Sequence, residues 1–411
     1  MINKFLSHYY ISIFSFGLLF IYQMIGVAIH KQFGFGFFYW PVQEYLLLIL
    51  SLITILGFKE KIFQFYDKSS LIFHIYFLSI ISFLFVYIFV ENYSNHIMNS
   101  EKSIILFETI IWYIISLVLA FNLKELNKNI TIKLLTIIYF IVLLFFFIYI
   151  IKLNAKYGAD IFRALIVGAN FDSSRINQFL SASGYVKGFH LYFSPMFSIF
   201  SIFYLYKIKE NNKNISFFII YILSIYILFL ASGRGSLLAF TFSIFLFMTN
   251  IKTKIISLCI IVFTFLPFAN YIEEHNPRFY NAITLNVEDD PSAIGRIKDF
   301  NHNMEYIENN LLVGGLRGYF EINSAYIHSA LAILQEYGIL IFLIFISMII
   351  HSGIIFLKLK NHPQFIFIGS WLSYVIIDMA LFKYIHEFKT MILFSIIYLY
   401  MLNLNKEKNV V

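Results

Sequence analysis

Arginine is scarce in this chain, and its positions are the first clue to chemistry. Of the 30 lysines and arginines only six are arginine, namely Arg163, Arg175, Arg234, Arg278, Arg296 and Arg317. A guanidinium group makes planar, two-pronged hydrogen bonds to phosphate or carboxylate, whereas the lysine ammonium acts as a point charge. The set therefore indicates recognition of an anionic substrate. The alternative is that single arginines pair with acids in their own loops, such as Asp172, Asp299 or Glu321.

A histidine stands in the segment Ala-Tyr-Ile-His-Ser, residues 325–329, just before a long apolar run. This order places His328 near the start of a helix that leads back into an apolar environment. A neutral imidazole in such a position can act as a general base. The alternative is a structural histidine that is hydrogen-bonded to a loop carbonyl.

A second candidate site is the short turn Ser-Gly-Arg-Gly-Ser at residues 232–236, between two apolar runs. The two glycines permit a sharp turn and close backbone approach. Ser236 can cap the following helix, and a helix N-terminus beside Arg234 is suited to binding an anion. The alternative is an arginine that merely extends toward water from a membrane boundary.

The elements that must position these residues are apolar to an unusual degree. Hydrophobic residues make up 60% of the 411 residues and charged residues 13%, against roughly 25% charged residues in an average globular chain. Such a chain cannot cover a water-exposed surface, which indicates an integral membrane protein. Cys259 is the only cysteine, so no disulfide forms within the chain. The first apolar stretch is too long for a signal-peptide core, and we expect it to be a retained span.

Twelve apolar runs have the length of a membrane span, which is about 20 residues. They cover residues 9–29, 38–58, 70–90, 103–122, 132–152, 188–207, 214–232, 235–251, 255–272, 337–357, 364–383 and 388–404. The runs are continuous rather than alternating, which favours helices over a barrel. The expected fold is an all-α membrane protein of about 12 transmembrane helices, forming one polytopic domain over residues 1–411.

Lysine positions give the expected orientation. With a cytoplasmic N-terminus, every inner loop is short and carries at least two lysines, as the positive-inside rule requires. These are Lys59, Lys61 and Lys68; Lys124, Lys128 and Lys133; Lys207, Lys209 and Lys213; Lys252 and Lys254; and Lys358 and Lys360, with Lys4, Lys406 and Lys408 at the termini. Both termini are then cytoplasmic, and all six arginines lie on the opposite side.

Two large outer loops follow from this topology, at residues 153–187 and 273–336. In the second, Asp290 and Pro291 mark a helix start. An apolar stripe recurs at spacings of three and four in Ile294, Ile297, Phe300, Met304, Ile307 and Leu311, which predicts an amphipathic helix on the bundle or at the membrane surface. Arg296, Asp299 and Asn303 share another face, which can point into a cavity. Asn309-Asn310 and Gly314-Gly315 end the helix.

The motifs from residue 215 to 345 resemble the O-antigen polymerase and O-antigen ligase superfamily. The likeness rests on the turn at 232–236, on Gly295-Arg296, on Asn-Leu-Leu-Val-Gly-Gly at 310–315, and on His328-Ser329 followed by Glu-Tyr-Gly at 336–338. It implies a GT-C-like polymerase/ligase bundle. By motif, the catalytic residues are His328, Arg234 and Arg296. The residues expected to bind substrate or pyrophosphate are Arg175, Arg163, Arg317, Ser236 and Tyr326.

The resemblance further implies a glycosyltransferase of the bacterial inner membrane with a periplasmic active site. The expected donor is a glycan on undecaprenyl pyrophosphate, and the acceptor is a second lipid-linked repeat unit. The scheme requires no metal ion and no cofactor. The expected partners are the lipid-linked oligosaccharide, the bilayer and a chain-length regulator protein, and no nucleic acid is expected. Two alternatives remain: a ligase that transfers the glycan to lipid A core, and a lipid-linked oligosaccharide flippase, which would show repeated halves and charged spans.

Overall fold

The computed structural model describes eight helices and a few shorter stretches of the chain. The described residues are 70–95, 189–210, 215–230, 234–247, 291–314, 330–381 and 388–410, with scattered positions between 49 and 52, 106 and 144, and 251 and 270. The helices are α3 (Leu71–Asn95), α8 (Phe189–Glu210), α9 (Ile215–Leu230), α10 (Arg234–Phe247), α13 (Pro291–Asn309), α15 (Leu331–Lys358), α16 (Phe365–Leu381) and α17 (Phe388–Val410). Within this described part the regular structure is helical and includes no strand.

Seven of these helices lie where the sequence predicts a span. They are α3, α8, α9, α10, α15, α16 and α17. Leu71–Phe89 of α3 and the whole of α15 are long and apolar enough to cross a membrane. The predicted spans at 9–29, 38–58, 103–122, 132–152 and 255–272 lie wholly or largely outside the described residues. The helical class is therefore confirmed for the described part, while the count of twelve stays a prediction.

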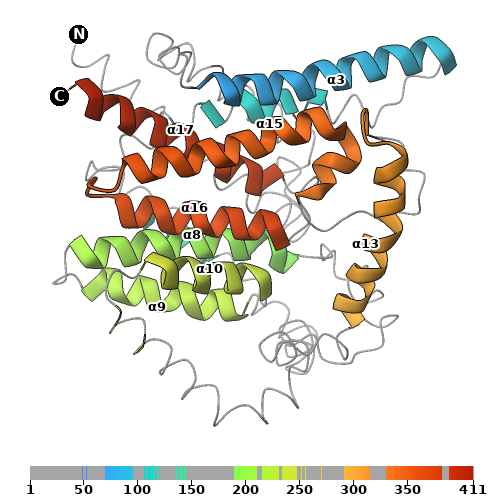
Figure 1. The fold of residues 1–411 in the computed structure, drawn as a ribbon. Coiled ribbons are helices and arrows are strands. Elements are labelled where there is room, and N and C mark those ends of the chain that lie inside the picture. The colour runs from blue at the N-terminus through green and yellow to red at the C-terminus, as the bar shows by residue number, and fades with distance from the viewer. Residues whose placement is uncertain are drawn as a thin grey trace.

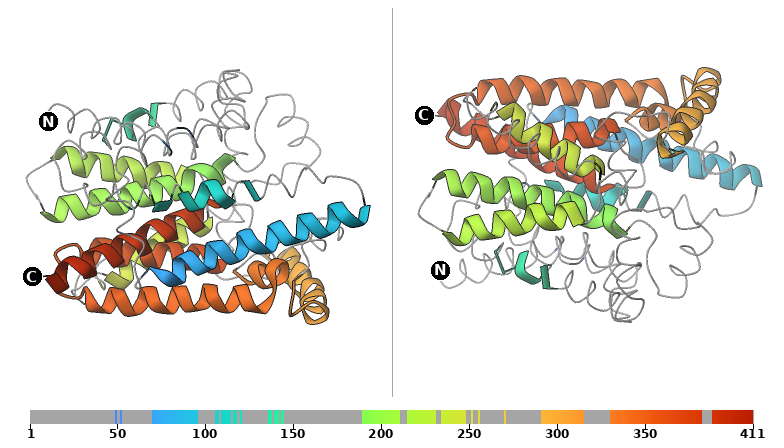
Figure 2. Two further views of the ribbon diagram at one scale, coloured as in Figure 1. Left: turned by 90° about the horizontal axis from the view of Figure 1, so that it is seen from above. Right: turned by 90° about the horizontal axis from the view of Figure 1, so that it is seen from below.

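The helices pack in a layered bundle with α13 at one end (Figure 1). Helices α8 and α9 lie side by side and are joined by residues 211–214, so they run antiparallel. Helix α10 packs along α16 and also touches α8, while α16 packs against α17. Helix α15 packs against both α3 and α17. Helix α13 packs against α15 and crosses the end of the bundle (Figure 2).

Helix α15 is apolar on its buried face and on its exposed face. Its inner stripe is buried and comprises Ile341, Phe345, Met348, Ser352 and Ile355. Its outer stripe is exposed and also mainly apolar, and comprises Leu340, Leu343, Ser347, Ile350, Ile354 and Leu357. Both stripes follow the helical spacing of three and four. A continuous exposed apolar face is rare on a water-soluble monomer, so the outer stripe supports a hydrocarbon environment.

Several polar groups inside the bundle are hydrogen-bonded within or between helices. The hydroxyls of Ser201 and Ser224 each donate to the carbonyl four residues earlier, at 2.7 Å. Between helices, His351 Nδ1 lies 2.7 Å from the hydroxyl of Tyr398. Such pairing removes the cost of bare polar groups in an apolar medium.

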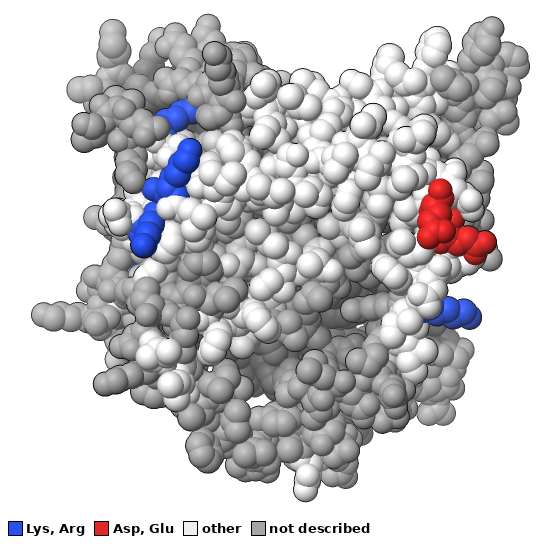
Figure 3. Space-filling model, viewed as in Figure 1, with Lys and Arg blue, Asp and Glu red and all other residues white. Residues whose placement is uncertain are grey.

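The described charged side chains gather at two opposite ends of the bundle, and α13 at one of these ends carries exposed acidic residues together with the exposed Lys298. Lysines mark the ends of α8, α15 and α17 and the start of α16, at Lys207, Lys358, Lys360 and Lys406. Figure 3 shows basic side chains at the end where these helices meet, and acidic ones over α13 at the other end. The acidic residues there are Glu305 and Glu308, both exposed. The lysine end is the one that the sequence predicts to be cytoplasmic.

Candidate functional site

The candidate site lies where α13, the turn after it and α15 meet. Helix α13 starts at Pro291, as the proline predicts, and ends at Asn309. The chain then turns back, with the Gly314 amide donating to the Asn310 carbonyl at 2.8 Å. Gly314 has a φ of +69°, a backbone conformation that favours glycine. The predicted helix end is thus confirmed, and the turn is directed at α15.

Helix α15 is interrupted at Gly338, which has φ 78° and ψ 178°. The interruption separates a short helical segment, residues 331–337, from a long one, residues 339–358. The Ile339 amide does not continue the helix but donates to the carbonyl of Leu311 at 2.9 Å. A break in an apolar helix leaves backbone groups that need a partner, and here the turn after α13 supplies one.

The two glycines allow the turn and the break to touch backbone to backbone. A Cβ added to Gly314 would lie 2.5 Å from the carbonyl carbon and oxygen of Glu336. A Cβ added to Gly338 would meet the carbonyl oxygen of Leu312. Side-chain atoms do not approach that closely, and both positions have positive φ as well. The contact is therefore specific to glycine at both positions.

A buried polar pair ties the same two helices together beside this contact. The side-chain amide of Gln335 donates to Oδ1 of Asn303 at 2.7 Å, and both side chains are almost fully buried. Glu336, the next residue along the chain, is also buried. Two polar side chains thus meet in an otherwise apolar interior, where each requires a partner.

A small apolar cluster covers the polar pair. Ile307 of α13 and Leu334 of α15 are buried against each other, with Met304 and Leu331 packed at the edge. The first half of the predicted apolar stripe behaves differently, because Ile294 and Ile297 are about half exposed (51% and 52%). Among the described side chains of α13, those that pack against the bundle therefore lie in its last turns. Its first turns offer apolar side chains to the surroundings, as a helix at a membrane surface does.

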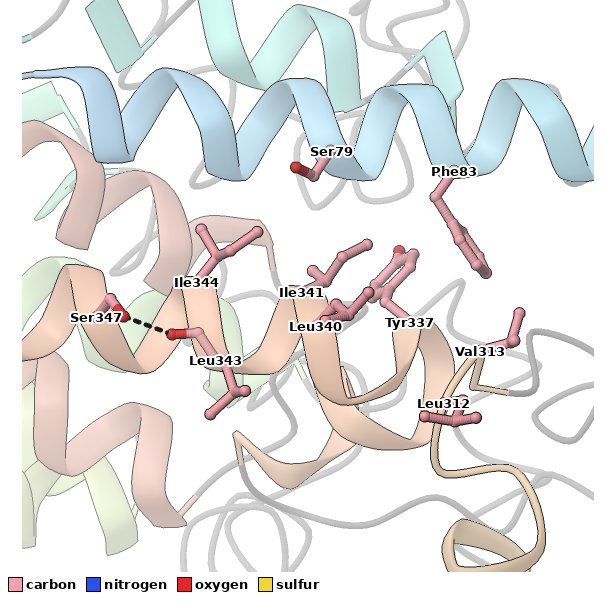
Figure 4. A pocket seen from close by; sticks show the side chains of 10 residues that line it. All are labelled: Ser79, Phe83, Leu312, Val313, Tyr337, Leu340, Ile341, Leu343, Ile344 and Ser347. Atoms are coloured by element: carbon pink, nitrogen blue, oxygen red, sulfur yellow. Dashed lines mark hydrogen bonds between the residues drawn. The ribbon is translucent and has the colours of Figure 1, made fainter.

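An apolar groove runs from the turn along α15, facing α3 (Figure 4). Its volume is about 710 Å³. The lining residues are Ser79, Phe83, Leu312, Val313, Tyr337, Leu340, Ile341, Leu343, Ile344 and Ser347. The hydroxyl of Ser347 donates a hydrogen bond to the carbonyl of Leu343, 2.8 Å away. The groove thus offers a long apolar surface that starts at the polar junction of α13 and α15.

Three of the sequence-predicted site residues stand on described helices. Arg296 lies on α13, seven residues before Asn303 and on the same face. Arg234 is the first residue of α10, so Ser236 lies within the first turn and is not the cap that the sequence suggested. Helix α9 starts beside the end of α8 and runs away from Lys207, and residues 231–233 then lead into α10. Arg234 therefore lies at the end of the bundle opposite Lys207.

The other predicted site residues lie outside the described residues, and so does the first large loop, 153–187. They are His328, Tyr326, Arg163, Arg175 and Arg317. His328 precedes the start of α15 by three positions, in keeping with the prediction that it stands near a helix start.

Asn303 and Gln335 form a buried contact that the sequence did not predict. The helical face of Arg296 and Asn303 was expected to point into a cavity, whereas Asn303 is packed against α15. The available signal was Gln335, a polar residue inside an apolar run, which in a membrane helix requires a partner.

No family model matches this chain, and no curated protein matches it. The resemblance to the O-antigen polymerase and ligase superfamily therefore stays a prediction from the sequence motifs.

Proposed function

We propose that this protein is a polysaccharide polymerase that transfers a glycan from undecaprenyl pyrophosphate onto a second lipid-linked repeat unit, outside the cytoplasm. The observation that carries the proposal is the contact between Gly314 and Gly338. These glycines belong to two separate motifs of the resemblance, Asn-Leu-Leu-Val-Gly-Gly and Glu-Tyr-Gly. Motifs that act as one unit are expected to meet in space, and these two do.

The proposed reaction forms a glycosidic bond and breaks the bond between the anomeric carbon and pyrophosphate. The acceptor hydroxyl oxygen attacks the anomeric carbon from the face opposite the leaving group, which inverts that centre. His328 accepts the hydroxyl proton. Undecaprenyl pyrophosphate leaves with the bonding electron pair, and Arg234 and Arg296 stabilise its added negative charge. Arg163, Arg175 and Arg317 contribute to binding the anionic donor.

The groove between α3 and α15 supports a lipid-linked substrate. Its lining is almost entirely apolar, and it starts beside the turn at Leu312 and Val313. A polyprenyl tail in this groove would leave the pyrophosphate near the end of the bundle where α13 carries Arg296. This arrangement suits a substrate with an apolar tail and a charged head.

The experiment that tests the function is the surface-glycan ladder of a strain in which this gene is deleted. A polymerase is expected to leave lipid A core with a single repeat unit, while all longer bands vanish. Loss of the single-repeat band as well would favour a ligase or a flippase. The side of the membrane on which lipid-linked glycan accumulates then separates those two: periplasmic for a ligase and cytoplasmic for a flippase.

A further inference from the structure

The break at Gly338 divides α15 into a long part and a short part. Residues 339–358 extend about 30 Å at 1.5 Å per residue, which equals the thickness of a bilayer core. The long part therefore suffices to span the membrane. The short part, residues 331–337, begins three positions after His328. Its direction is set by the contacts that hold the break.

Those contacts come from α13 and the turn that follows it. The Ile339 amide is bonded to the Leu311 carbonyl at 2.9 Å. Gly314 and Gly338 let the two backbones approach more closely than any side chain allows. On the short part itself, Gln335 is bonded to Asn303 at 2.7 Å. Backbone and side-chain contacts thus fix both sides of the break to one helix.

We infer that Gly314, Gly338, Asn303 and Gln335 form a joint that sets the segment 331–337 relative to α13, the helix that carries Arg296. They are positioning residues, because the contacts described for them are with protein groups. The inference rests on the proposed transfer reaction. That reaction needs a base and a phosphate-binding arginine held at a fixed separation, and small displacements of reacting groups are costly to its rate.

The glycines provide the first test, with Gly353 as a matched control. Gly353 lies on the same helix, and a Cβ there would meet nothing within 4 Å. The probe is the lipid-linked repeat unit extracted from the deletion strain, supplied to purified protein in detergent. Gly314→Ala and Gly338→Ala are expected to lower kcat per folded protein on the order of 100-fold. The KM for the repeat unit should stay unchanged, and Gly353→Ala should behave as wild type.

The polar pair provides a second test that does not force a backbone clash. Asn303→Gln lengthens one side chain and Gln335→Asn shortens the other, so each alone should lower kcat. The double exchange keeps the combined length of the two side chains and should recover most of the lost kcat. A purely structural role would instead lower the folded fraction and leave kcat per folded molecule unchanged.

Wild-type kcat in folded Gly314→Ala and Gly338→Ala would overturn the joint. A kcat of the double variant that is no higher than that of the worse single variant would also overturn the inference. The proposed function fails in a different way, because the wild-type protein itself would then extend no lipid-linked repeat unit. In that case there is no reaction for the joint to position, and the inference is overturned together with the function.

Discussion

Gln335 donates a 2.7 Å hydrogen bond to Asn303, which stands 32 positions earlier in the chain, and both side chains are shut away from solvent. The bond links an amphipathic helix at the end of the bundle to a helix long enough to cross a membrane. An amide pair is a costly choice for an apolar interior unless the geometry it fixes is needed. Its position beside Gly314 and Gly338 places it at the junction of the motifs.

The first prediction concerns the stability of this pair. Asn303→Leu and Gln335→Leu each leave a buried polar partner behind, which typically costs about 1–3 kcal/mol. The double Leu variant should lose less than the sum of the two, because it leaves neither amide behind. Thermal unfolding in detergent measures all three, with His302→Ala as the control on the exposed face of α13. Strictly additive losses would argue against coupling between the two side chains.

The second prediction concerns the outer face of α15. Ile350 is 58% exposed and lies in the middle part of the straight segment. If lipid covers that face, Ile350→Arg places a charge in hydrocarbon at a cost of about 2.5–3.5 kcal/mol on insertion scales. The amount of protein in the membrane should fall for Ile350→Arg and stay at the wild-type level for Ile350→Ala. Equal amounts of the two variants would mean that water reaches this face.

The third prediction concerns orientation. With Cys259 replaced by Ala, single cysteines are introduced at Leu312, beside Gly338, and at Asn361, after Lys358, which are both exposed and lie at opposite ends of the segment 339–358. A membrane-impermeant maleimide added to intact spheroplasts should label Leu312→Cys and spare Asn361→Cys until the membrane is opened. The expected labelling pattern follows from the lysines near residue 361, which the positive-inside rule places on the cytoplasmic side. The opposite labelling pattern would invert the topology and place α13 in the cytoplasm.

Sequence reasoning predicted α13 well because its signals are local. Pro291 suits the first helical position, and the Asn and Gly residues after 308 suit its end. The same reasoning placed a span at 337–357, whereas α15 begins at Leu331. Hydropathy cannot register the break at Gly338, because its backbone angles depend on a contact with Leu312 that is distant in sequence. The burial of Asn303 was missed for the same reason, since its partner lies on another helix.

The predicted site stays a prediction, because the structure describes only the helix positions of Arg234, Ser236 and Arg296 among its residues. Arg234 and Arg296 were placed by motif, and the structure puts both at helix positions on the side of the bundle away from Lys207. Ser236 was expected as a cap but lies inside the first turn of α10, because the helix starts at the arginine and not after the second glycine. Glycine is a poor helix former, yet packing against α16 overrides that local preference.

The fourth prediction concerns the arginines and the histidine. Arg234→Ala, Arg296→Ala and His328→Ala should each abolish polymer while the protein stays in the membrane. Arg234→Lys should restore little, because an ammonium group lacks the planar fork that grips phosphate. Glycan ladders of complemented deletion strains measure this, with membrane levels checked by immunoblot. Normal ladders in all three Ala variants would remove these residues from the site.

The most direct measurement is polymerisation by the purified protein. Lipid-linked repeat units accumulated by the deletion strain are added to the wild-type protein in detergent, with no lipid A core, no nucleotide sugar and no other protein present. The account predicts a ladder of lipid-linked products that grow one repeat at a time, with undecaprenyl pyrophosphate released at each step. Repeat units that stay unextended with wild-type protein, yet are transferred once lipid A core is supplied, would contradict it.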